Sequence, residues 1–464
     1  MSDARARDVH EVELVFRASL DEILQSQSVT QQPSSLAVAY SGGLDSSVLL
    51  FLAQRYCLQA QIPLIAYYIH HGLSKNASAW QTHCAHQCVS LNVPFKSRAV
   101  QVQNQGQGIE SEARQQRYRA LGELCQEDHV AILLTAHHSD DQAETILMQL
   151  FRGTGLRGLA GMDQVNVAPE LLQSKSIAIA RPLLSCSKAQ LHEYAQKNQI
   201  SCVQDESNTD INFTRNALRL RVMPEIEKIY PDFPERLQRT AVHMRSSIRL
   251  LDDLAAQDLR DCSDCQGVLV QSVLSLNQDR IRNLFRYWLL TQKLKLPSVS
   301  KLEEMCQQLF SARDDARVQI RHDHYLLSRY GGRLALIDTR KCSEHSGDIY
   351  LRWQGEACLP IPQLKGRLLF ERDAQGIDES ILRQANLVVR QRVPGARLRL
   401  AANRPSRDLK SHFQSARVPF WQREKLPYVY IEDRLFFVGL LGIDAAFISS
   451  SQEVQTISLS WVPD

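Results

Sequence analysis

Short apolar runs alternate with amphipathic helical patterns over about the first 225 residues, and this alternation constrains the fold more than any other feature. The apolar runs predict strands at Leu36–Tyr40, Ile62–Ile69, Ala131–Thr135 and Ser176–Ala180. Strands that alternate with helices are joined by parallel crossover connections. We therefore predict an α/β fold with a doubly wound, Rossmann-like parallel sheet, whose ligands bind at the carboxyl ends of the strands.

A glycine-rich turn follows the first predicted strand. Two glycines let the backbone turn tightly and approach an anion, and the N-terminus of the next helix offers unpaired N–H groups. The spacing differs from that of a Walker loop and includes no lysine. We interpret this turn as a loop that holds pyrophosphate, formed by Ser41, Gly42, Gly43, Leu44, Asp45 and Ser46.

Asp45 is unexpected in such a loop, because a carboxylate repels phosphate unless a cation lies between them. Mg²⁺ bridging Asp45 and the phosphate oxygens would remove this conflict. The alternative is an ordinary Gly-Gly turn in which Asp45 caps the helix. The complete string of seven residues, 41–47, between a strand and a helix favours the phosphate loop.

The string Ser-Gly-Gly-Leu-Asp-Ser resembles the signature of the ATP-pyrophosphatase (PP-loop) superfamily. Members of this superfamily cleave ATP between the α- and β-phosphates and adenylate a substrate oxygen. The resemblance therefore implies that the chain binds ATP together with Mg²⁺.

Further strings narrow the resemblance to one family within that superfamily. They are Ile69-His70-His71-Gly72-Leu73-Ser74, Glu110-x-x-Ala113-Arg114-x-x-Arg117-Tyr118, Thr135-Ala136-His137-His138-Ser139-Asp140-Asp141-Gln142-Ala143-Glu144-Thr145, Arg152-Gly153-Thr154-Gly155, Arg181-Pro182-Leu183-Leu184, Asp205-x-Ser207-Asn208 and Arg215-Asn216-x-x-Arg219. In this order they resemble the tRNA(Ile)-lysidine synthase family. In that family the wobble cytidine of the isoleucine tRNA with a CAU anticodon is adenylated at its C2 oxygen, and free L-lysine then displaces AMP. The resemblance implies a ligase that forms a carbon–nitrogen bond.

Five side chains are our candidates for the chemistry: Asp45, Arg114, His137, Asp141 and Glu144. Asp141 and Glu144 share one helix face, so they are expected to contact Mg²⁺ or the lysine ammonium group, with Asp141 as a second magnesium ligand. Arg114 is expected to reach phosphate, and His137 to contact phosphate or act as a base. The alternative for the acidic residues is an exposed helix start that complements the helix dipole.

Arg215 and Arg219 lie on one helical face, and two interpretations stay open for them. They contact tRNA or the nucleotide, or they are structural salt-bridge partners. The cysteines leave further alternatives open. A zinc site formed by His70 and His71 with Cys84, His86 and Cys88 is disfavoured, because Cys84 and Cys88 lie on an apolar helical face. Cys262-x-x-Cys265 is weak support for a tRNA thiolase of the same superfamily.

A basic segment lies near the C-terminus. Residues 386–425 contain ten Lys or Arg and only two acidic residues, whereas the net charge of the whole chain is +3. This concentration favours contact with the phosphate backbone of tRNA over a solvated basic face. The candidate contacts are Arg392, Arg397, Arg407, Lys410 and Arg423.

The segments predict three domains: residues 1–230 for catalysis, a mainly helical tRNA-binding middle domain at 231–345, and a small β-rich tRNA-binding domain at 355–464. Eleven cysteines without a secretory signal favour a reducing cytoplasmic setting, and no apolar run is long enough to span a membrane. A homodimer is among the assemblies that the sequence leaves open. A non-catalytic tRNA-binding protein is the alternative to an enzyme.

Overall fold

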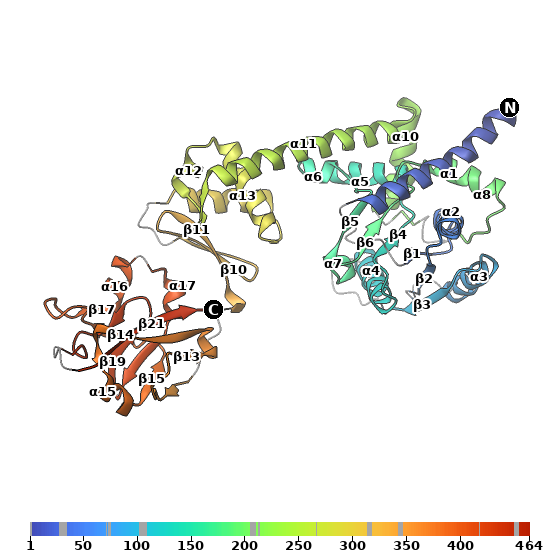
Figure 1. Cartoon of the computed structure of the whole chain (residues 1–464). Coiled ribbons are helices and arrows are strands. Elements are labelled where there is room, and N and C mark those ends of the chain that lie inside the picture. Colours follow the sequence, from blue (N-terminus) through green and yellow to red (C-terminus); the bar gives the residue numbers. More distant parts are fainter. Residues whose placement is uncertain are drawn as a thin grey trace. The chain divides into compact units, whose positions relative to one another are not determined.

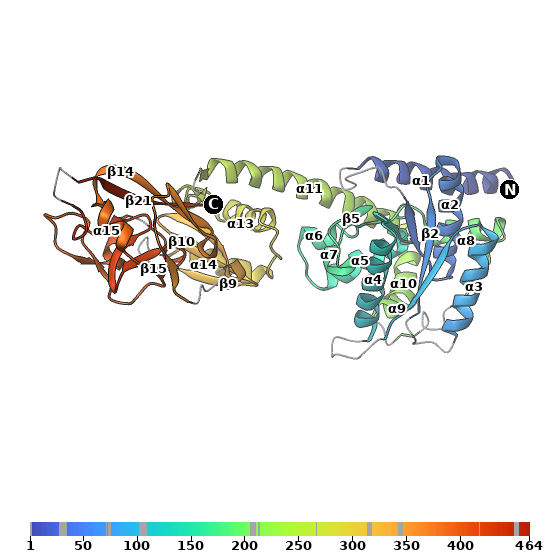
Figure 2. The same ribbon diagram turned by 60° about the horizontal axis from the view of Figure 1, so that its bottom comes forward.

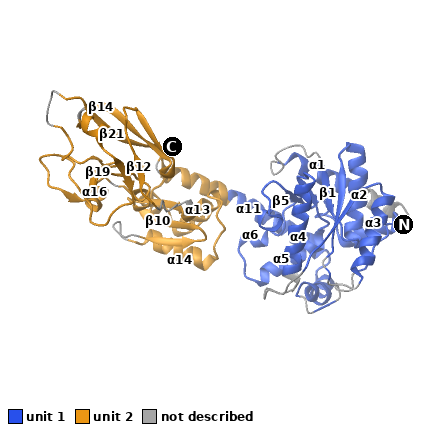
Figure 3. Cartoon of the chain, turned by 90° about the horizontal axis from the view of Figure 1, so that it is seen from below, with its two compact units in different colours: residues 1–250 blue, residues 251–464 orange. Residues whose placement is uncertain are grey.

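The computed structural model describes residues 2–26, 35–70, 72, 76–101, 109–204, 210–211, 214–265, 267–312, 318–341, 347–416, 418–449 and 454–464. The chain divides into two compact units, Met1–Leu250 and Leu251–Asp464, which Figure 3 shows in blue and orange. Several residues of the sequence motifs lie outside the described residues: His71, Leu73, Ser74, Asp205, Ser207, Asn208 and Arg417.

The first unit is built on a six-stranded sheet with the order β3-β2-β1-β4-β6-β5, in which β5 is an antiparallel edge strand and the others are parallel (Figure 1). This confirms the predicted doubly wound parallel sheet. The strands are β1 (Leu36–Ala39), β2 (Leu64–His70), β3 (Phe95–Ala99), β4 (Ile132–Leu134), β5 (Val165–Val167) and β6 (Ala178–Ala180).

Helices cover both faces of this sheet (Figure 2). Successive strand residues point to opposite faces, so Leu36 and Val38 enter one buried cluster while Ala37 enters another. The first cluster packs against α1 (Ser2–Gln25), α2 (Leu44–Ala60), α3 (Ala77–Ser90) and α8 (Lys188–Lys197), and the second against α4 (Ile109–Glu127) and α7 (Pro169–Leu172). The remaining helices of this unit are α5 (Ser139–Phe151), α6 (Leu156–Leu159), α9 (Thr214–Ala217), the π-helix η2 (Leu218–Val222) and α10 (Met223–Ile229).

The helix α11 (Phe233–Asp261) begins in the first unit and ends in the second. In the second unit, α12 (Val270–Leu274), α13 (Gln278–Thr291) and α14 (Val299–Phe310) pack with a sheet of β9 (Gln319–His322), β10 (Tyr325–Tyr330) and β11 (Arg333–Asp338). Apolar residues of α13 recur at helical spacing, and Leu284, Phe285 and Trp288 are buried in this core. A mainly helical middle segment was predicted here.

The C-terminal part of the second unit is β-rich, as predicted. A five-stranded sheet and a three-stranded sheet share one apolar core. The first contains β12 (Ile349–Leu351), β15 (Leu387–Arg390), β18 (Tyr428–Ile431), β19 (Arg434–Val438) and β20 (Gly442–Ile443), and the second contains β13 (Cys358–Ile361), β14 (Gly366–Asp378) and β21 (Thr456–Pro463). The predicted boundary at residues 345–355 falls inside this compact unit.

Across the described ranges, the structure contains no helix with both the length and the apolar character needed to span a lipid bilayer.

Gly42 gives a test of the turn that starts α2. Its φ is +81°, and a Cβ at this position would lie 2.7 Å from Cys84 Sγ. We expect Gly42→Ala to lower the free energy of unfolding by about 1–3 kcal/mol, because the backbone conformation and the contact are both strained. Urea denaturation followed by circular dichroism measures this. Gly43→Ala is the matched control, because its Cβ would meet only Ser41 Oγ at 3.6 Å. Equal stability of the two variants would contradict the observed turn geometry.

Candidate active site

Three parallel strands of the first unit, β1, β4 and β6, end side by side at the carboxyl end of the sheet, which we call the sheet edge below. Val38 of β1 is paired with Leu134 of β4, and Leu134 is paired with Ala180 of β6. The chain runs from β1 toward β2 and β3 on one side, whereas β4 and β6 lie on the other, so β1 and β4 flank a topological switch point. Such a point is the usual ligand site of a doubly wound sheet. The segments after these strands therefore meet there.

The loop after β1 is held in a closed turn by its own serines. The Ser41 and Ser46 hydroxyls lie 3.0 Å apart, and the Ser46 hydroxyl donates to Gly43 O at 3.0 Å. The loop is also fastened from outside, because Val203 N donates to Gly42 O at 2.9 Å. Leu44 begins α2, whose first N–H groups have no partner within the helix. This geometry suits an anion.

Asp45 lies in the first turn of α2, and its side chain is about one-third exposed. Its Oδ1 atom is buried and accepts no hydrogen bond from any residue that the structure describes. Burial raises the pKa of Asp45, as does the neighbouring charge of Asp141, while His138 opposes this rise. An unpaired buried carboxylate oxygen is a site where a cation is favoured.

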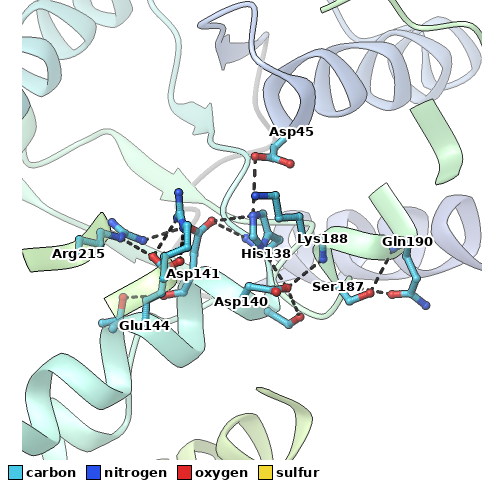
Figure 4. Close-up of polar contacts among 12 residues, drawn as sticks. Asp45, His138, Asp140, Asp141, Glu144, Ser187, Lys188, Gln190 and Arg215 are labelled. Carbon is cyan, nitrogen blue, oxygen red and sulfur yellow. Dashed lines mark hydrogen bonds and ion pairs between the residues drawn. The ribbon is translucent and has the colours of Figure 1, made fainter. Parts of the chain in front are cut away.

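His138 connects Asp45 to the segment after β4. Its side chain is almost fully buried, and Nε2 lies 3.7 Å from Asp45 Oδ2 and 3.4 Å from Asp141 Oδ2 (Figure 4). Its Nδ1 atom lies 3.5 Å from Asp140 Oδ2. Burial by itself disfavours the imidazolium, but the nearby carboxylates of Asp140, Asp141 and Asp45 raise the pKa of His138. The position of His138 between the two carboxylates therefore favours its protonated form.

Asp141 and Glu144 lie on α5 and are paired with two arginines from the later helices α9 and η2. The Glu144 side chain is completely buried, and it accepts from Arg215 Nε at 2.6 Å and from Arg219 Nε at 2.5 Å. Asp141 Oδ1 lies 2.9 Å from Arg215 Nη2 and 3.2 Å from Arg219 Nη2. Of the two interpretations left open by the sequence, the structure shows Arg215 and Arg219 as salt-bridge partners. Each guanidinium side chain keeps about a quarter of its surface exposed.

His137 lies beside these groups and is neutral. Its Nδ1 atom is 3.0 Å from Thr135 Oγ1. Burial lowers the pKa of His137 to about 3, and the positive charges of Arg181, Arg114 and Arg215 add to this effect. Arg114 stacks over the Tyr118 ring, with its guanidinium carbon 4.9 Å from the ring centroid.

The structure gathers the predicted residues of the first unit around this sheet edge: Ser41, Gly42, Gly43, Leu44, Asp45, Ser46, Arg114, His137, Asp141, Glu144, Arg215 and Arg219. Sequence reasoning gave no role to His138, Asp140 or Arg181, although they belong to the quoted strings. The signal that could have identified them is their place next to the carboxyl ends of strands: Arg181 directly follows β6, and His138 and Asp140 lie at the start of the helix after β4. Asp140 also accepts from the backbone N of Lys188 at 2.9 Å, and this bond ties α5 to the start of α8.

The predicted tRNA contacts of the second unit differ in exposure. Arg392, Arg397, Arg407 and Lys410 are exposed. Arg423 is 6% exposed, donates to Val418 O at 2.7 Å, and stacks over the buried Phe413 ring. The prediction that Arg423 contacts tRNA is therefore corrected: its guanidinium is used inside the fold, so we leave it out of the tRNA surface. Phe413 is likewise unavailable for stacking on a base.

The cysteines considered for metal or sulfur chemistry are placed as follows. Cys84 and Cys88 are completely buried in the core beside α2, and burial raises the pKa of each thiol to about 12. Cys262 is buried in the core of the second unit, whereas Cys265 is exposed. Within the part of the chain that the structure describes, no group of three or more His, Cys, Asp or Glu side chains is arranged to hold a metal ion.

The parallel sheet with its glycine loop defines a PP-loop ATP-pyrophosphatase domain, and the family described as "PP-loop domain" matches residues 12–226. Two further families match: "TilS substrate binding domain" at residues 270–335 and "TilS substrate C-terminal domain" at residues 387–461.

Relatives named tRNA(Ile)-lysidine synthase match over nearly the whole chain. The protein of Burkholderia pseudomallei is 36% identical over 93% of both chains, and that of Coxiella burnetii is 32% identical over 93% of this chain and 94% of its own. The protein of Serratia proteamaculans is 35% identical over 92% of this chain and 94% of its own. The chain belongs to the tRNA(Ile)-lysidine synthase family.

The buried network around Glu144 predicts a stability effect. We expect Arg219→Ala to lower the free energy of unfolding by about 2 kcal/mol, because it removes two charged hydrogen bonds from a fully buried carboxylate that Arg215 still pairs. Arg221→Ala, at an exposed position of the same π-helix, is the control and should change stability by less than about 0.5 kcal/mol. Both are measured by chemical denaturation. An Arg219→Ala variant as stable as the control would contradict the network.

Proposed function

We propose that the chain joins L-lysine to the C2 position of the wobble cytidine in the isoleucine tRNA with a CAU anticodon, with release of AMP and pyrophosphate. The observation that carries this is the serine–glycine loop at the carboxyl end of β1, with Asp45 beside His138 and Asp141. It occurs in a chain whose relatives are named tRNA(Ile)-lysidine synthase. ATP is the nucleotide that the PP-loop family binds, and tRNA is the macromolecular substrate.

In the first step the cytidine C2 oxygen attacks the α-phosphorus of ATP. The bond between the α-phosphorus and the α,β-bridging oxygen breaks, and pyrophosphate leaves. Residues 41–46 would hold the pyrophosphate through backbone N–H groups at the start of α2 and through the Ser41 and Ser46 hydroxyls. Arg114 and the neutral His137 would face the α-phosphate, since positive groups already surround His137.

Mg²⁺ fits the same site. Asp45 offers a buried oxygen without a partner among the described residues, and Asp141 lies on the other side of His138. Only these two carboxylates would serve, so phosphate oxygens and water would complete the coordination, as Mg²⁺ prefers. When bound, the ion supplies positive charge to the triphosphate. Asp45 and Asp141 hold and orient it.

In the second step a neutral lysine amine attacks C2, the bond between C2 and the adenylated oxygen breaks, and AMP leaves with the electron pair. The amine proton passes to a base. His137 is a weak base because burial keeps its pKa at about 3, which favours a phosphate contact over proton transfer. Asp141 and Glu144 would hold a lysine ammonium group only in competition with Arg215 and Arg219, whose guanidiniums pair with both carboxylates.

The lysine assay tests the whole proposal. With ATP, Mg²⁺, labelled lysine and the isoleucine tRNA with a CAU anticodon, we expect one lysine incorporated per AMP formed. Asp45→Asn should reduce ATP–pyrophosphate exchange by about 100-fold or more, because the loop then lacks the carboxylate that holds the cation. Asp279→Asn, whose side chain is 89% exposed on α13, is the matched control and should keep full activity.

Two results would contradict this function. Thiolation of the tRNA without lysine incorporation would favour the thiolase alternative. Absence of ATP–pyrophosphate exchange in the wild-type chain, together with tight tRNA binding, would favour a non-catalytic tRNA-binding protein.

We further propose that Arg392, Arg397, Arg407 and Lys410 contact the tRNA backbone. The double variant Arg392→Glu/Lys410→Glu should raise KM for tRNA about tenfold or more and reduce the dependence of binding on salt, while KM for ATP stays unchanged. Arg367→Glu, an exposed change on β14 outside this segment, is the control. Unchanged tRNA affinity in the double variant would remove the segment from the interface. The expected change in KM for tRNA does not depend on whether the protein is a monomer or a homodimer.

A further inference from the structure

Arg181 is a buried cation that forms no salt bridge with any residue that the structure describes. It is 7% exposed, and its Nη1 atom donates to Asn166 Oδ1 at 2.7 Å and to Asp163 O at 2.8 Å. Both of these acceptors are neutral. The Nε atom is buried and has no hydrogen-bond partner in the described part of the chain. Burial lowers the pKa of Arg181, as does the positive charge of Arg114, whereas the charge of Asp163 opposes this shift. Such an arrangement is costly unless it serves an anion.

The strands place this cation at the active-site edge. Arg181 directly follows β6, and Thr135 directly follows the neighbouring strand β4, with Thr135 N donating to Ala180 O at 2.8 Å. Thr135 also contacts His137 Nδ1. The charges of Arg181 and Arg114 both act on His137, and Tyr118, under the Arg114 guanidinium, interacts with Arg181 as well. The positive charges of Arg181 and Arg114 therefore lie close to the neutral His137.

A structural role accounts for only part of this geometry. The hydrogen bonds of Nη1 fasten the segment 163–166, which includes the start of β5, to the end of β6. An uncharged side chain with an N–H donor at position 181 could hold the segment 163–166 equally well, without the free-energy cost of burying a charge. That role explains neither the unpartnered Nε nor the accumulation of three positive side chains, Arg114, Arg181 and Arg215, around a neutral histidine.

We infer that Arg181 is a positioning residue for the phosphate that stays in the active site: a fixed positive charge behind His137 and Arg114 that stabilises the α-phosphate of ATP and, later, the departing AMP. This rests on the proposed function, in which the α-phosphate is present in both steps. Negative charge on that phosphate increases as the bond between C2 and the adenylated oxygen breaks. A preorganised buried charge stabilises such a change without reorganisation.

Three variants separate charge from structure. Arg181→Gln keeps a hydrogen-bond donor and removes the charge, Arg181→Lys keeps the charge and changes the donor geometry, and Asn166→Ala removes the hydrogen-bond partner alone. The probes are AMP, adenosine and inorganic pyrophosphate, each titrated into the full chain by calorimetry, together with the rate of AMP formation at saturating substrates.

We expect Arg181→Gln to weaken AMP binding roughly tenfold and to lower the rate of AMP formation by at least as much, as loss of a nearby charge predicts at an effective dielectric constant near 20. Adenosine and pyrophosphate affinities should not change, because neither ligand carries the α-phosphate. Arg181→Lys should restore most of the loss, and Asn166→Ala should leave AMP binding and rate near those of the wild type.

The outcomes distinguish this inference from the proposed function. Normal AMP affinity and rate in Arg181→Gln would overturn the inference, as would an equal loss in Arg181→Lys and Asn166→Ala, which would make Arg181 purely structural. If Arg181→Gln weakens AMP binding but the wild-type chain incorporates no lysine, the inference stands and the proposed reaction fails.

Discussion

The position of His138 between the carboxylates of Asp45 and Asp141 is the interaction on which the site depends. Two neighbouring, partly buried carboxylates repel each other, so a positive charge between them is stabilising. In this structure His138 occupies that place, and Asp140 Oδ2 lies 3.5 Å from its other ring nitrogen. The same geometry leaves one Asp45 oxygen without a partner among the described residues, and this is where we propose that Mg²⁺ binds.

Charge around this centre is arranged in two regions. Toward the phosphate loop the side chains are acidic and hold cations, while around His137 they are basic and suit an anion. Glu144 belongs to neither region. Its completely buried carboxylate pairs with Arg215 and Arg219. The π-helix that carries Arg219 is a rare conformation that often occurs at functional sites, which agrees with this position. The network thus sets the place of both guanidiniums before any ligand binds.

The sequence predicted the strands that carry the site well, because buried parallel strands are continuous apolar runs followed by distinctive polar turns. The sequence analysis missed two strands. One is β3 (Phe95–Ala99), which is not a continuous apolar run because it contains Lys96 and Arg98, and the other is β5, an edge strand of three residues. The family, and with it the reaction, could be read from the ordered motifs. The partners of Glu144 could not, since Arg215 and Arg219 lie more than 70 residues away along the chain. Helical spacing placed Glu144 correctly on the face of Asp141, but only the fold shows that this face is buried. Arg423 shows the same limit, because a cluster of charges in sequence does not reveal which guanidinium is enclosed.

The most direct measurement of the central claim is a crystal structure of the chain with Mg²⁺ and the α,β-methylene analogue of ATP, which cannot be cleaved at the reacting bond. The account predicts that the β- and γ-phosphates lie on residues 41–46 at the start of α2, that Asp45 is a ligand of Mg²⁺, and that the α-phosphate faces His137 and Arg114. A triphosphate bound away from this loop, or a metal ion that does not contact Asp45, would contradict it.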